Sequence, residues 1–428
     1  MALSKNIVYV DGVRTPFLRS NTDYNDLMSY QLGSFAIKGL MDKTGLDPNK
    51  VDRVIMGTTI SNVKTGNVAR EAALSAGLPN KVACHTVTQA CISANQAITS
   101  GVEQILAGQA EVIIAGGTDC ISDAPILFNK PMRKKLMAAQ KLKGIGEYLK
   151  FATTLGLKDF VPEAPAVAEY TTGRTMGMDC ELLAARYGVT REAQDEFAVR
   201  SHQMAHQAHE AGLLKEELIS VSFPPKFNVV DRDNGVRGDT KYDKISKLKP
   251  AFSKPHGTIT AANASFLTDG ATASLIMSED KAKELGLKPK AYIREYAYSA
   301  GDLDEELLLG PTYAVSMVLE KAGLTLADMD VIEFHEAFAG QILANVKCLA
   351  SDEFAQKKLG RDKAVGQINM EKFNKWGGSL AIGHPFGATG SRMLAYTANR
   401  LIKEGGRYGL FAACAAGAHG HAMIIERY

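Results

Sequence analysis

The sequence predicts a layered α/β fold made of two similar halves. Short apolar runs alternate along the chain with stretches of helical periodicity, which is the pattern of βα units. The 428 residues are 46% hydrophobic and 22% charged, and this composition excludes a disordered or fibrous chain. With 49 basic and 47 acidic side chains the net charge is only +2, so no nucleic-acid partner is expected.

The first half is expected to begin with a strand at residues 7–10 and to contain a βαβ unit further along. Residues 82–87 and 111–115 are typical of buried strands. The apolar side chains between them recur at helical spacing, at Ile98, Val102 and Ile105. Cys91 therefore lies at a strand-to-helix junction. No targeting segment is visible before the first strand, so a cytoplasmic location is expected.

The C-terminal half repeats this scheme. Four apolar runs predict its strands, at residues 331–334, 380–384, 408–413 and 421–425. The first run leads into the segment 335–338 and a helix, and the second into a helix that carries Met393 and Leu401. The last two runs lie on either side of Cys414. Both halves thus place reactive residues directly after strands.

The middle of the chain is expected to form an inserted domain that covers the core. It is Lys-rich at its start and interrupted by prolines, its segment 178–212 has a helical pattern, and its polar segment 223–249 predicts loops with short strands. The predicted division is an N-terminal half of residues 1–121 and 256–285, an inserted domain of residues 122–255, and a C-terminal half of residues 286–428.

Four segments combine reactive side chains with glycine-rich or small-residue turns: residues 89–95, 335–338, 377–390 and 414–420. Ligands of an α/β sheet bind outside the carboxyl ends of its strands, where reactive residues from different strands converge. We therefore expect these segments to form one site. The six cysteines include no CxxC pair and are too sparse for a disulfide framework, so free thiols and no metal site are expected.

Cys91 is the first candidate for chemistry. A free thiol has a pKa near 8.5, and a helix N-terminus together with a neighbouring imidazole would lower this pKa by ~2. The resulting thiolate is a nucleophile. A buried cysteine with only a structural role is the alternative, and the position alone leaves both interpretations open.

His384 and Cys414 are the next candidates. His384 lies in the turn Gly383-His-Pro-Phe-Gly387, where it could take a thiol proton or polarise a carbonyl, or simply be solvated. Small residues follow Cys414, and they either offer backbone N–H groups to an oxyanion or form a tight strand turn. The sequence lacks the signatures of P-loop, serine esterase and zinc protease sites.

With these segments in place, the sequence resembles the thiolase family, and most closely the β-subunits (3-ketoacyl-CoA thiolases) of fatty-acid-oxidation trifunctional complexes. The likeness covers nearly the whole chain and includes further blocks at residues 13–16, 67–73, 176–205 and 257–265. It implies a five-layered αβαβα fold with two similar halves and a loop domain that binds coenzyme A. It also implies a homodimer or tetramer, coenzyme A as a substrate and no permanently bound cofactor.

The resemblance implies roles for eight residues. Cys91 matches the nucleophile that becomes acylated, His384 the histidine that activates it, and Cys414 the cysteine that shuttles a proton at the substrate α-carbon. His335 with His384 would bind the thioester enolate, and the backbone N–H groups of Cys91 and Ala416 would bind the other oxyanion. Three residues match positions along the pantetheine channel: Met176, Ser265 and Phe338. The implied reaction, part of fatty-acid β-oxidation, is cleavage of 3-ketoacyl-CoA by coenzyme A to acetyl-CoA and a shortened acyl-CoA.

Three residues depart from the commonest family pattern. His335 stands where most thiolases have Asn, and the His-Glu-Ala-Phe form is similar to that of trifunctional β-subunits, which favours medium or long acyl chains. Thr175 replaces a histidine that short-chain biosynthetic members often carry. Ala418 replaces a glycine and is expected to crowd the turn after Cys414.

Three other functions are alternatives. A β-ketoacyl synthase shares the fold and the nucleophile, but Cys414 stands where that class has a second imidazole. A biosynthetic acetoacetyl-CoA thiolase is the second alternative. A non-catalytic acyl-CoA-binding subunit is the third, and the retention of all four reactive side chains argues against it.

The segment 130–157 contains the strongest local charge. Between residues 130 and 150, seven Lys or Arg residues stand against the single acid Glu147, with apolar side chains among them. Such a segment can lie on an anionic membrane, dock a partner chain, or be a solvated helical face that helps to hold the coenzyme A phosphates. The resemblance favours docking, either of a hydratase/dehydrogenase α-chain or in a peripheral membrane contact.

Overall fold

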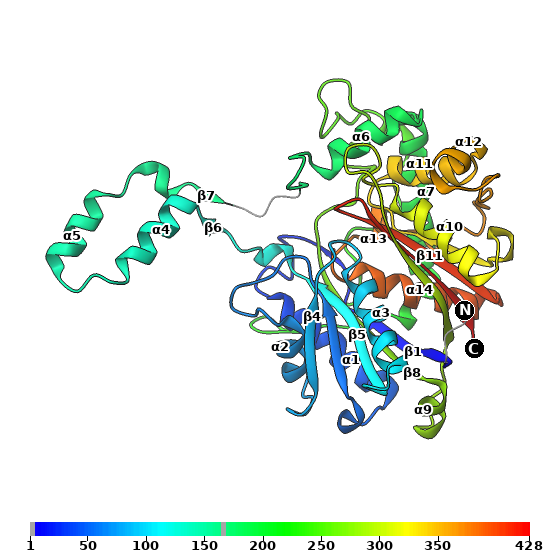
Figure 1. The fold of residues 1–428 in the computed structure, drawn as a ribbon, viewed down its shortest axis with the longest axis horizontal. Coiled ribbons are helices and arrows are strands. Elements are labelled where there is room, and N and C mark those ends of the chain that lie inside the picture. Colours follow the sequence, from blue (N-terminus) through cyan, green and yellow to red (C-terminus); the bar gives the residue numbers. More distant parts are fainter. Residues whose placement is uncertain (1–4, 164–167) are drawn as a thin grey trace.

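The computed structural model describes residues 5–163 and 168–428 and has the predicted α/β architecture (Figure 1). Its centre is a ten-stranded mixed sheet with the strand order β10-β11-β12-β9-β1-β8-β5-β3-β4, and β2 pairs with β8 outside this path. The strands are β1 (Ile7–Arg14), β2 (Leu18–Arg19), β3 (Arg53–Gly57), β4 (Ala83–Val87), β5 (Val112–Asp119), β8 (Thr268–Ser278), β9 (Ala291–Ala300), β10 (Val331–Phe334), β11 (Tyr408–Ala415) and β12 (His419–Arg427).

The sheet joins the two halves through β1 and β9. β1 pairs with β8 along most of its length but with β9 only at two positions, Val8 opposite Tyr292 and Tyr9 opposite Ala291. In the first half β3 runs parallel to β4 and to β5. In the second half β10 runs parallel to β11. β4 and β10 are the two end strands of the order and run in opposite directions, so strand pairing alone does not bring together the residues that follow them.

Five layers follow from how the apolar side chains are buried. Helices α3 and α14 pack together with strands of both halves in one central core. A second core lies between α1, α2 and the strands of the first half, and a third between α10, α11 and the strands of the second half. The helices of the two halves are α1 (Ser29–Thr44), α2 (Val68–Ser75), α3 (Ser93–Leu106), α9 (Glu279–Glu284), α10 (Gly310–Ala322), α11 (Ala339–Leu349), α12 (Asp352–Phe354), α13 (Ser379–Ile382) and α14 (Thr389–Glu404).

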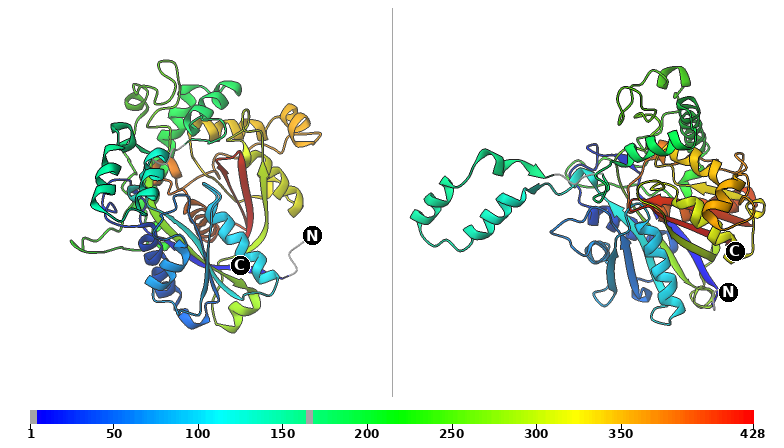
Figure 2. Two further views of the ribbon diagram at one scale, coloured as in Figure 1. Left: turned by 60° about the vertical axis from the view of Figure 1, so that its left-hand side comes forward. Right: turned by 45° about the horizontal axis from the view of Figure 1, so that its top comes forward.

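Residues 122–255, which we propose as an inserted domain, contribute none of their described strands to the ten-stranded sheet. Their elements are β6 (Leu127–Phe128), α4 (Lys130–Ala139), α5 (Ile145–Thr153), β7 (Pro162–Glu163), α6 (Met176–Arg186), α7 (Arg191–Glu210) and α8 (Tyr242–Ile245). Helices α6 and α7 lie on the body of the molecule, whereas residues 127–163, here called the arm, project away from it (Figures 1 and 2). The predicted helical pattern of 178–212 is confirmed, with an interruption at Gly188, whose φ is 58°.

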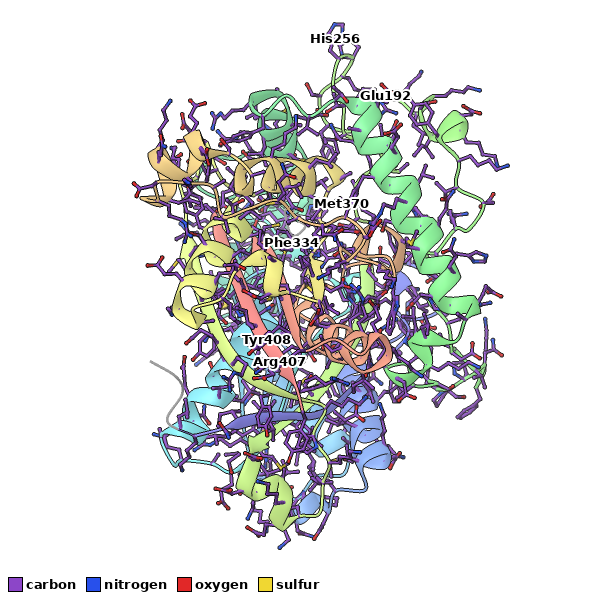
Figure 3. All side chains as sticks on the ribbon, turned by 90° about the vertical axis from the view of Figure 1, so that its right-hand side faces the viewer. Glu192, His256, Phe334, Met370, Arg407 and Tyr408 are labelled. Carbon is purple, nitrogen blue, oxygen red and sulfur yellow. The ribbon has the colours of Figure 1, made fainter. Side chains whose placement is uncertain are left out.

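The side of the sheet that faces the insertion is visible in Figure 3. Phe334, the last residue of β10, lies nearer to the labelled Glu192 of the insertion, and to His256 directly after the insertion, than Arg407 and Tyr408 do, where β11 begins. The carboxyl ends of β10 and β11 therefore point toward the insertion. Within the described part of the chain, no helix is long and apolar enough to cross a membrane.

The prediction of a strand at 380–384 is wrong. Residues 379–382 form the short helix α13, and Gly383 turns the chain away from it with a φ of 109°. Three buried hydrophobic residues in a row, Leu380 to Ile382, are too few to show whether the period is that of a strand or of a buried helix. The first turn is held by the Glu336 carboxylate, which accepts a hydrogen bond from the backbone N–H of Leu380 (3.2 Å). The other strands predicted for the two halves are confirmed. The short strands expected at 223–249 are not found: this segment has loops, one isolated bridge between Val221 and Val230, and the short helix α8.

Candidate active site

A cavity of about 520 Å³ lies where the two halves and the insertion meet. Seven of the eight predicted site residues line it: Cys91, Met176, Ser265, Phe338, His384, Cys414 and Ala416. The eighth, His335, is fully buried, and its ring centroid is 3.9 Å from that of His384. The sequence segments expected to converge thus do so, although they are up to 323 residues apart along the chain from Cys91 to Cys414.

Cys91 is held by a sharp turn between β4 and α3. Ala90, immediately before it, has a φ of 46°, in the left-handed region that costs a non-glycine residue energy. The Ala90 carbonyl accepts hydrogen bonds from the hydroxyls of Thr59 (3.0 Å) and Ser93 (2.7 Å), and these contacts secure the turn. Cys91 is half-buried and faces the cavity two residues before α3 begins.

The expected lowering of the Cys91 pKa is wrong for the free protein. Burial raises the pKa of this thiol to about 12, against the opposing effect of a hydrogen bond from the backbone N–H of Ala416. The imidazole cannot supply a positive charge, because burial and then Arg392 lower the pKa of His384 to about 3. The free site therefore contains a neutral thiol and a neutral imidazole, and the proton must leave Cys91 during its attack on a substrate.

The hydrogen bonds of His384 define which ring nitrogen is the base. Its Nδ1 lies 2.6 Å from the Thr389 hydroxyl, and that hydroxyl donates to the Pro385 carbonyl (3.0 Å). Because a threonine hydroxyl has one proton, it must accept from the Nδ1–H of the imidazole. The proton of His384 is then on Nδ1. Its Nε2 is buried, has no hydrogen-bond partner among the described residues, and therefore keeps a free lone pair.

His335 has the opposite arrangement. Its Nδ1 lies 3.0 Å from the Ser379 hydroxyl, and the Ser379 oxygen also accepts a hydrogen bond from the Arg392 guanidinium (3.3 Å). Since a guanidinium only donates, the serine proton is free to go to His335 Nδ1. The imidazole proton is then on Nε2, which is also buried and finds no hydrogen-bond partner in residues 5–163 and 168–428. The two adjacent rings thus offer one acceptor and one donor.

Cys414 is the penultimate residue of β11 and is buried beside the cavity. Burial, and next the proximity of Cys91, raise the pKa of the Cys414 thiol. The turn after it bends at Gly417 and Ala418, which have φ values of 82° and 56°. Ala418 is fully buried. The expected crowding at Ala418 thus takes the form of a left-handed backbone in a residue with a Cβ.

Two buried carboxylates position the loops, and sequence reasoning assigned neither. Asp119, at the end of β5 in the first half, accepts hydrogen bonds from the backbone N–H groups of Thr59 (3.0 Å) and Gly387 (2.5 Å). It therefore ties the His384 loop of the second half to the first half. Glu336 accepts from Ser201 (2.6 Å) and Asn374 (2.7 Å) and so fixes the segment that carries His335. Their partners are too far apart in sequence to give a signal.

The rest of the cavity wall is mostly apolar. Phe338 packs edge-on against Phe252, with ring centroids 6.1 Å apart, and the backbone N–H of Ser265 donates to the Ala337 carbonyl (2.9 Å). Met176 begins α6, and the side chain of Thr175 caps that helix. The sequence did not identify several lining residues: Arg19, Phe252, Leu308 and Phe386. In the described residues, no group of three or more His, Cys, Asp or Glu side chains could hold a metal ion.

Comparison with known proteins decides the family. Residues 7–280 match the thiolase N-terminal domain, and residues 287–427 match the thiolase C-terminal domain. The chain belongs to the thiolase family. The sequence-based identification is therefore confirmed, and with it the acyltransferase class.

Similar thiolases are known from animals and bacteria. The chain is 54% identical over 99% of its length to the mitochondrial trifunctional enzyme subunit beta of Homo sapiens, of which 89% is covered. It is 50% identical to the probable 3-ketoacyl-CoA thiolase of Caenorhabditis elegans, with 99% of this chain and 94% of that protein covered. The crystal structure of human mitochondrial 3-ketoacyl-CoA thiolase in complex with CoA superposes with a TM-score of 0.85 at 32% identity, covering 100% of this chain and 99% of that one. The predicted thiolase fold is confirmed.

Proposed function

We propose that this thiolase cleaves 3-ketoacyl-CoA with coenzyme A in fatty-acid β-oxidation, yielding acetyl-CoA and a shortened acyl-CoA through a thioester on Cys91. The 3-ketoacyl-CoA thiolase activity predicted from the sequence agrees with the names of the similar proteins. The observation that carries the mechanism is the meeting of Cys91, His384 and Cys414 in one cavity. Coenzyme A is a substrate in this reaction, and no bound cofactor is needed for any step below.

The first step is attack by Cys91 on the keto carbonyl. Its thiol proton passes to the free lone pair on His384 Nε2, and a sulfur–carbon bond forms. The keto oxygen becomes an oxyanion. Backbone N–H groups of Cys91 and Ala416 are its proposed donors, since both lie against the sulfur, where they also lower the thiol pKa.

The second step is cleavage of the bond between the α- and β-carbons. The electron pair of this bond moves onto the acetyl-CoA thioester, whose oxygen becomes an enolate. We assign the Nε2–H groups of His335 and of the newly protonated His384, whose ring centroids are 3.9 Å apart, as the donors to that oxygen. The Cys414 thiol gives its proton to the α-carbon, and acetyl-CoA leaves with Cys91 acylated.

The third step returns the enzyme to its starting state. Coenzyme A enters, its thiol gives a proton to the Cys414 thiolate, and its sulfur attacks the Cys91 thioester. The Cys91 sulfur leaves and recovers its proton from His384. A thiol suits this role because it leaves as readily as it attacks.

The site also supports proposals on the substrate. The apolar wall around Phe252 and Phe338 suits the pantetheine arm and an acyl chain, with Met176, Ser265 and Phe338 beside the arm. His335 in place of Asn favours medium or long chains over acetoacetyl-CoA. Residues 122–255 are the proposed coenzyme A domain, since Thr175, Met176 and Phe252 come from this segment.

The arm supports a proposal on partners. Apolar side chains on it are highly exposed, including Ile145 (81%), Leu149 (65%) and Leu157 (92%). Because they lie beside the basic residues of α4 and α5, we propose that the arm docks an α-type hydratase/dehydrogenase chain or an anionic membrane surface. A homodimer or tetramer and a cytoplasmic location stay predictions.

The test is an assay of the purified chain with short-, medium- and long-chain 3-ketoacyl-CoA and coenzyme A. Cleavage of medium- or long-chain substrates is expected. Cleavage of acetoacetyl-CoA alone would favour the biosynthetic thiolase, and no cleavage at all would favour the non-catalytic subunit. Cys91→Ala should abolish both cleavage and labelling of the protein by an acyl-CoA. Cys84→Ser, at a half-buried cysteine on β4, is the matched control and should keep both.

A further inference from the structure

Arg392 is a buried cation on α14 and is 2% exposed. Within the part of the chain that the structure describes, it is bonded to no carboxylate, and its Nε and Nη1 atoms have no hydrogen-bond partner. Its guanidinium donates to the Ser379 hydroxyl (3.3 Å) and lies 5.2 Å from the centre of the Tyr396 ring. A buried charge is costly unless it is paired or has a function.

The nearby carboxylates are engaged elsewhere. Glu333 pairs with Arg400 (2.5 Å), about two turns further along α14, and Arg392 lowers the Glu333 pKa less than Arg400 does. Glu336 is bound by Ser201 and Asn374. The groups that face Arg392 from the catalytic side are His335 and His384, and its charge lowers the pKa of each of them. The positive charge of Arg392 thus acts on both imidazoles of the site.

Ser379 connects this charge to His335. Arg392 can only donate to the serine oxygen, so the serine proton must go to an acceptor. Among the described residues, the acceptor that lies within hydrogen-bond distance of this hydroxyl is His335 Nδ1, at 3.0 Å. Hydrogen bonds are therefore donated in one direction only, from Arg392 to Ser379 and from Ser379 to His335 Nδ1. The imidazole proton of His335 is then on Nε2.

We propose that Arg392 and Ser379 are positioning residues that keep the His335 proton on Nε2, so that this ring donates to the enolate oxygen of acetyl-CoA. This inference rests on the proposed function. The positive charge of Arg392 also attracts the negative charge of the enolate oxygen. This attraction stabilises the enolate relative to the neutral thioester. The other oxyanion depends on backbone N–H groups and does not involve this chain of contacts.

The two oxyanions can be tested separately. Exchange of the α-protons of acetyl-CoA with deuterium oxide requires the enolate. Exchange of labelled coenzyme A with an acyl-CoA requires only acyl transfer to and from Cys91. The variants are Ser379→Ala, Arg392→Met and Arg392→Lys. The matched controls are Ser391→Ala, which removes another buried hydroxyl that contacts Ser274, and Arg400→Lys, which alters another buried arginine of α14.

We expect Ser379→Ala and Arg392→Met to slow α-proton exchange by about 10- to 100-fold, since the ring stays but its tautomer is no longer fixed. Acyl exchange and the KM for acetyl-CoA should stay within about threefold of wild type. Arg392→Lys keeps the charge and a hydrogen-bond donor, so its rate of α-proton exchange should decrease less than that of Arg392→Met. Both controls should keep both reactions. Equal loss of the two reactions in Ser379→Ala and Arg392→Met would assign these residues a merely structural role and overturn the proposal.

A spectroscopic measurement separates this proposal from the proposed function. The ring ¹⁵N signals of His335, identified by their absence in His335→Gln, should show a protonated Nε2 in the wild-type chain and a shift of the proton toward Nδ1 in Ser379→Ala. A wild-type His335 protonated on Nδ1 would overturn the proposal whatever the activity. If the wild-type chain lacks both exchange reactions, the proposed function fails while the ring signals still test the contacts.

Discussion

The imidazole rings of His335 and His384 lie 3.9 Å apart, centroid to centroid, and neither is hydrogen-bonded to a carboxylate in the described part of the chain. Two rings this close in a buried site cannot both carry a positive charge. Burial lowers the pKa of both, with Arg392 adding to the effect. The pair therefore begins neutral, which lets one ring accept a proton while the other donates a hydrogen bond.

The first prediction concerns pH and the stability contributed by His384. Its pKa in the folded chain is about 3, well below its unfolded value near 6.5, so the unfolded chain binds a proton that the folded chain does not. The contribution of the neutral His384 ring to the free energy of unfolding is fully present above about pH 6.5, and it decreases as the pH falls toward 3. His384→Gln lacks this effect. The stability of wild type relative to His384→Gln should therefore decrease below about pH 6.5.

The measurement is urea unfolding of both proteins at several pH values. The difference in stability between the two proteins is needed because other groups also titrate in this range. Burial raises the pKa of Glu333 to about 7, for example, and this contributes a slope of opposite sign to the total stability. In the same pH range, kcat/KM of wild type should show no inflection from an imidazolium near 6.5. Such an inflection, with a constant stability difference, would mean that His384 is charged in the free enzyme.

A second prediction separates the two thiols. Cys414→Ala should still be acylated at Cys91 by an acyl-CoA, because the base and the backbone N–H donors are intact. It should lose exchange of the acetyl-CoA α-protons, since the group that gives and takes them is gone. Mass spectrometry of the acyl-enzyme and deuterium incorporation measure the two properties. If the variant exchanges the α-protons at the wild-type rate, another group, His384 or His335, must transfer them instead of Cys414.

A third prediction concerns the pantetheine arm. Ser265 lines the cavity, and its backbone is fixed by the bond to Ala337, so a larger side chain must enter the cavity. Ser265→Trp should raise KM by about 10-fold or more for every acyl-CoA alike, because the arm is common to all of them. KM values for short- and long-chain substrates check this. A rise confined to long chains would place Ser265 beside the acyl chain instead.

A fourth prediction concerns the turn after Cys414. Ala418→Gly removes a left-handed strain of about 1–2 kcal/mol but also a buried methyl worth about 0.8 kcal/mol and some chain stiffness. The free energy of unfolding should therefore stay within about 1 kcal/mol of wild type. Ala418→Val, whose branched side chain cannot adopt this φ easily, should lose at least about 2 kcal/mol. Equal stability of the Gly and Val variants would show that the turn is unstrained.

A fifth prediction concerns the basic side chains of the arm. Arg133 pairs with Glu163 and Lys135 with Asp159, so these two hold the arm together. In the described chain the ammonium groups of Lys134, Lys141 and Lys143 form no ion pair, so these residues are the better probes of docking. Replacing these three with Gln should weaken binding to anionic vesicles or to an α-type chain by up to about 100-fold, at roughly 1 kcal/mol per charge.

Three measurements check the arm: binding to phosphatidylserine vesicles against phosphatidylcholine vesicles, co-purification with an α-type chain, and KM for coenzyme A. Docking predicts loss of one of the first two with KM unchanged. A rise in KM alone would assign the arm to the coenzyme A phosphates and contradict docking. The paired change of Arg133 and Lys135 to Gln is the control for unfolding of the arm.

The sequence predicted most strands and the convergence of the reactive segments, because both depend on local patterns. Residues 7–10 and 331–334 are apolar runs bounded by polar residues, and the structure has strands there. The strand predicted at 380–384 was wrong because so short a buried segment does not show whether its period is that of a strand or of a helix. Its helical state depends on Glu336, whose contact with Leu380 is a tertiary one.

Protonation could not be predicted from the sequence. A strand-to-helix junction suggests a thiolate at Cys91, but the pKa of this thiol depends on how deeply the completed fold buries it. The same holds for Arg392, which follows the glycine-rich segment in sequence yet acts only through its tertiary contact with Ser379. The protonation and the contacts of such groups depend on the residues around them in the folded chain, and these residues come from distant parts of the sequence.

The hydrogen bond from Gly387 to Asp119 makes reactivity conditional on assembly of the whole molecule. While a nascent chain has folded only its first half, Cys91 has no base, because His384 is nearly 300 residues further along. The oxyanion donor at Ala416 arrives later still. A partly synthesised or proteolytically cleaved chain would therefore be inactive, and Cys91 would not be acylated by acyl-CoA.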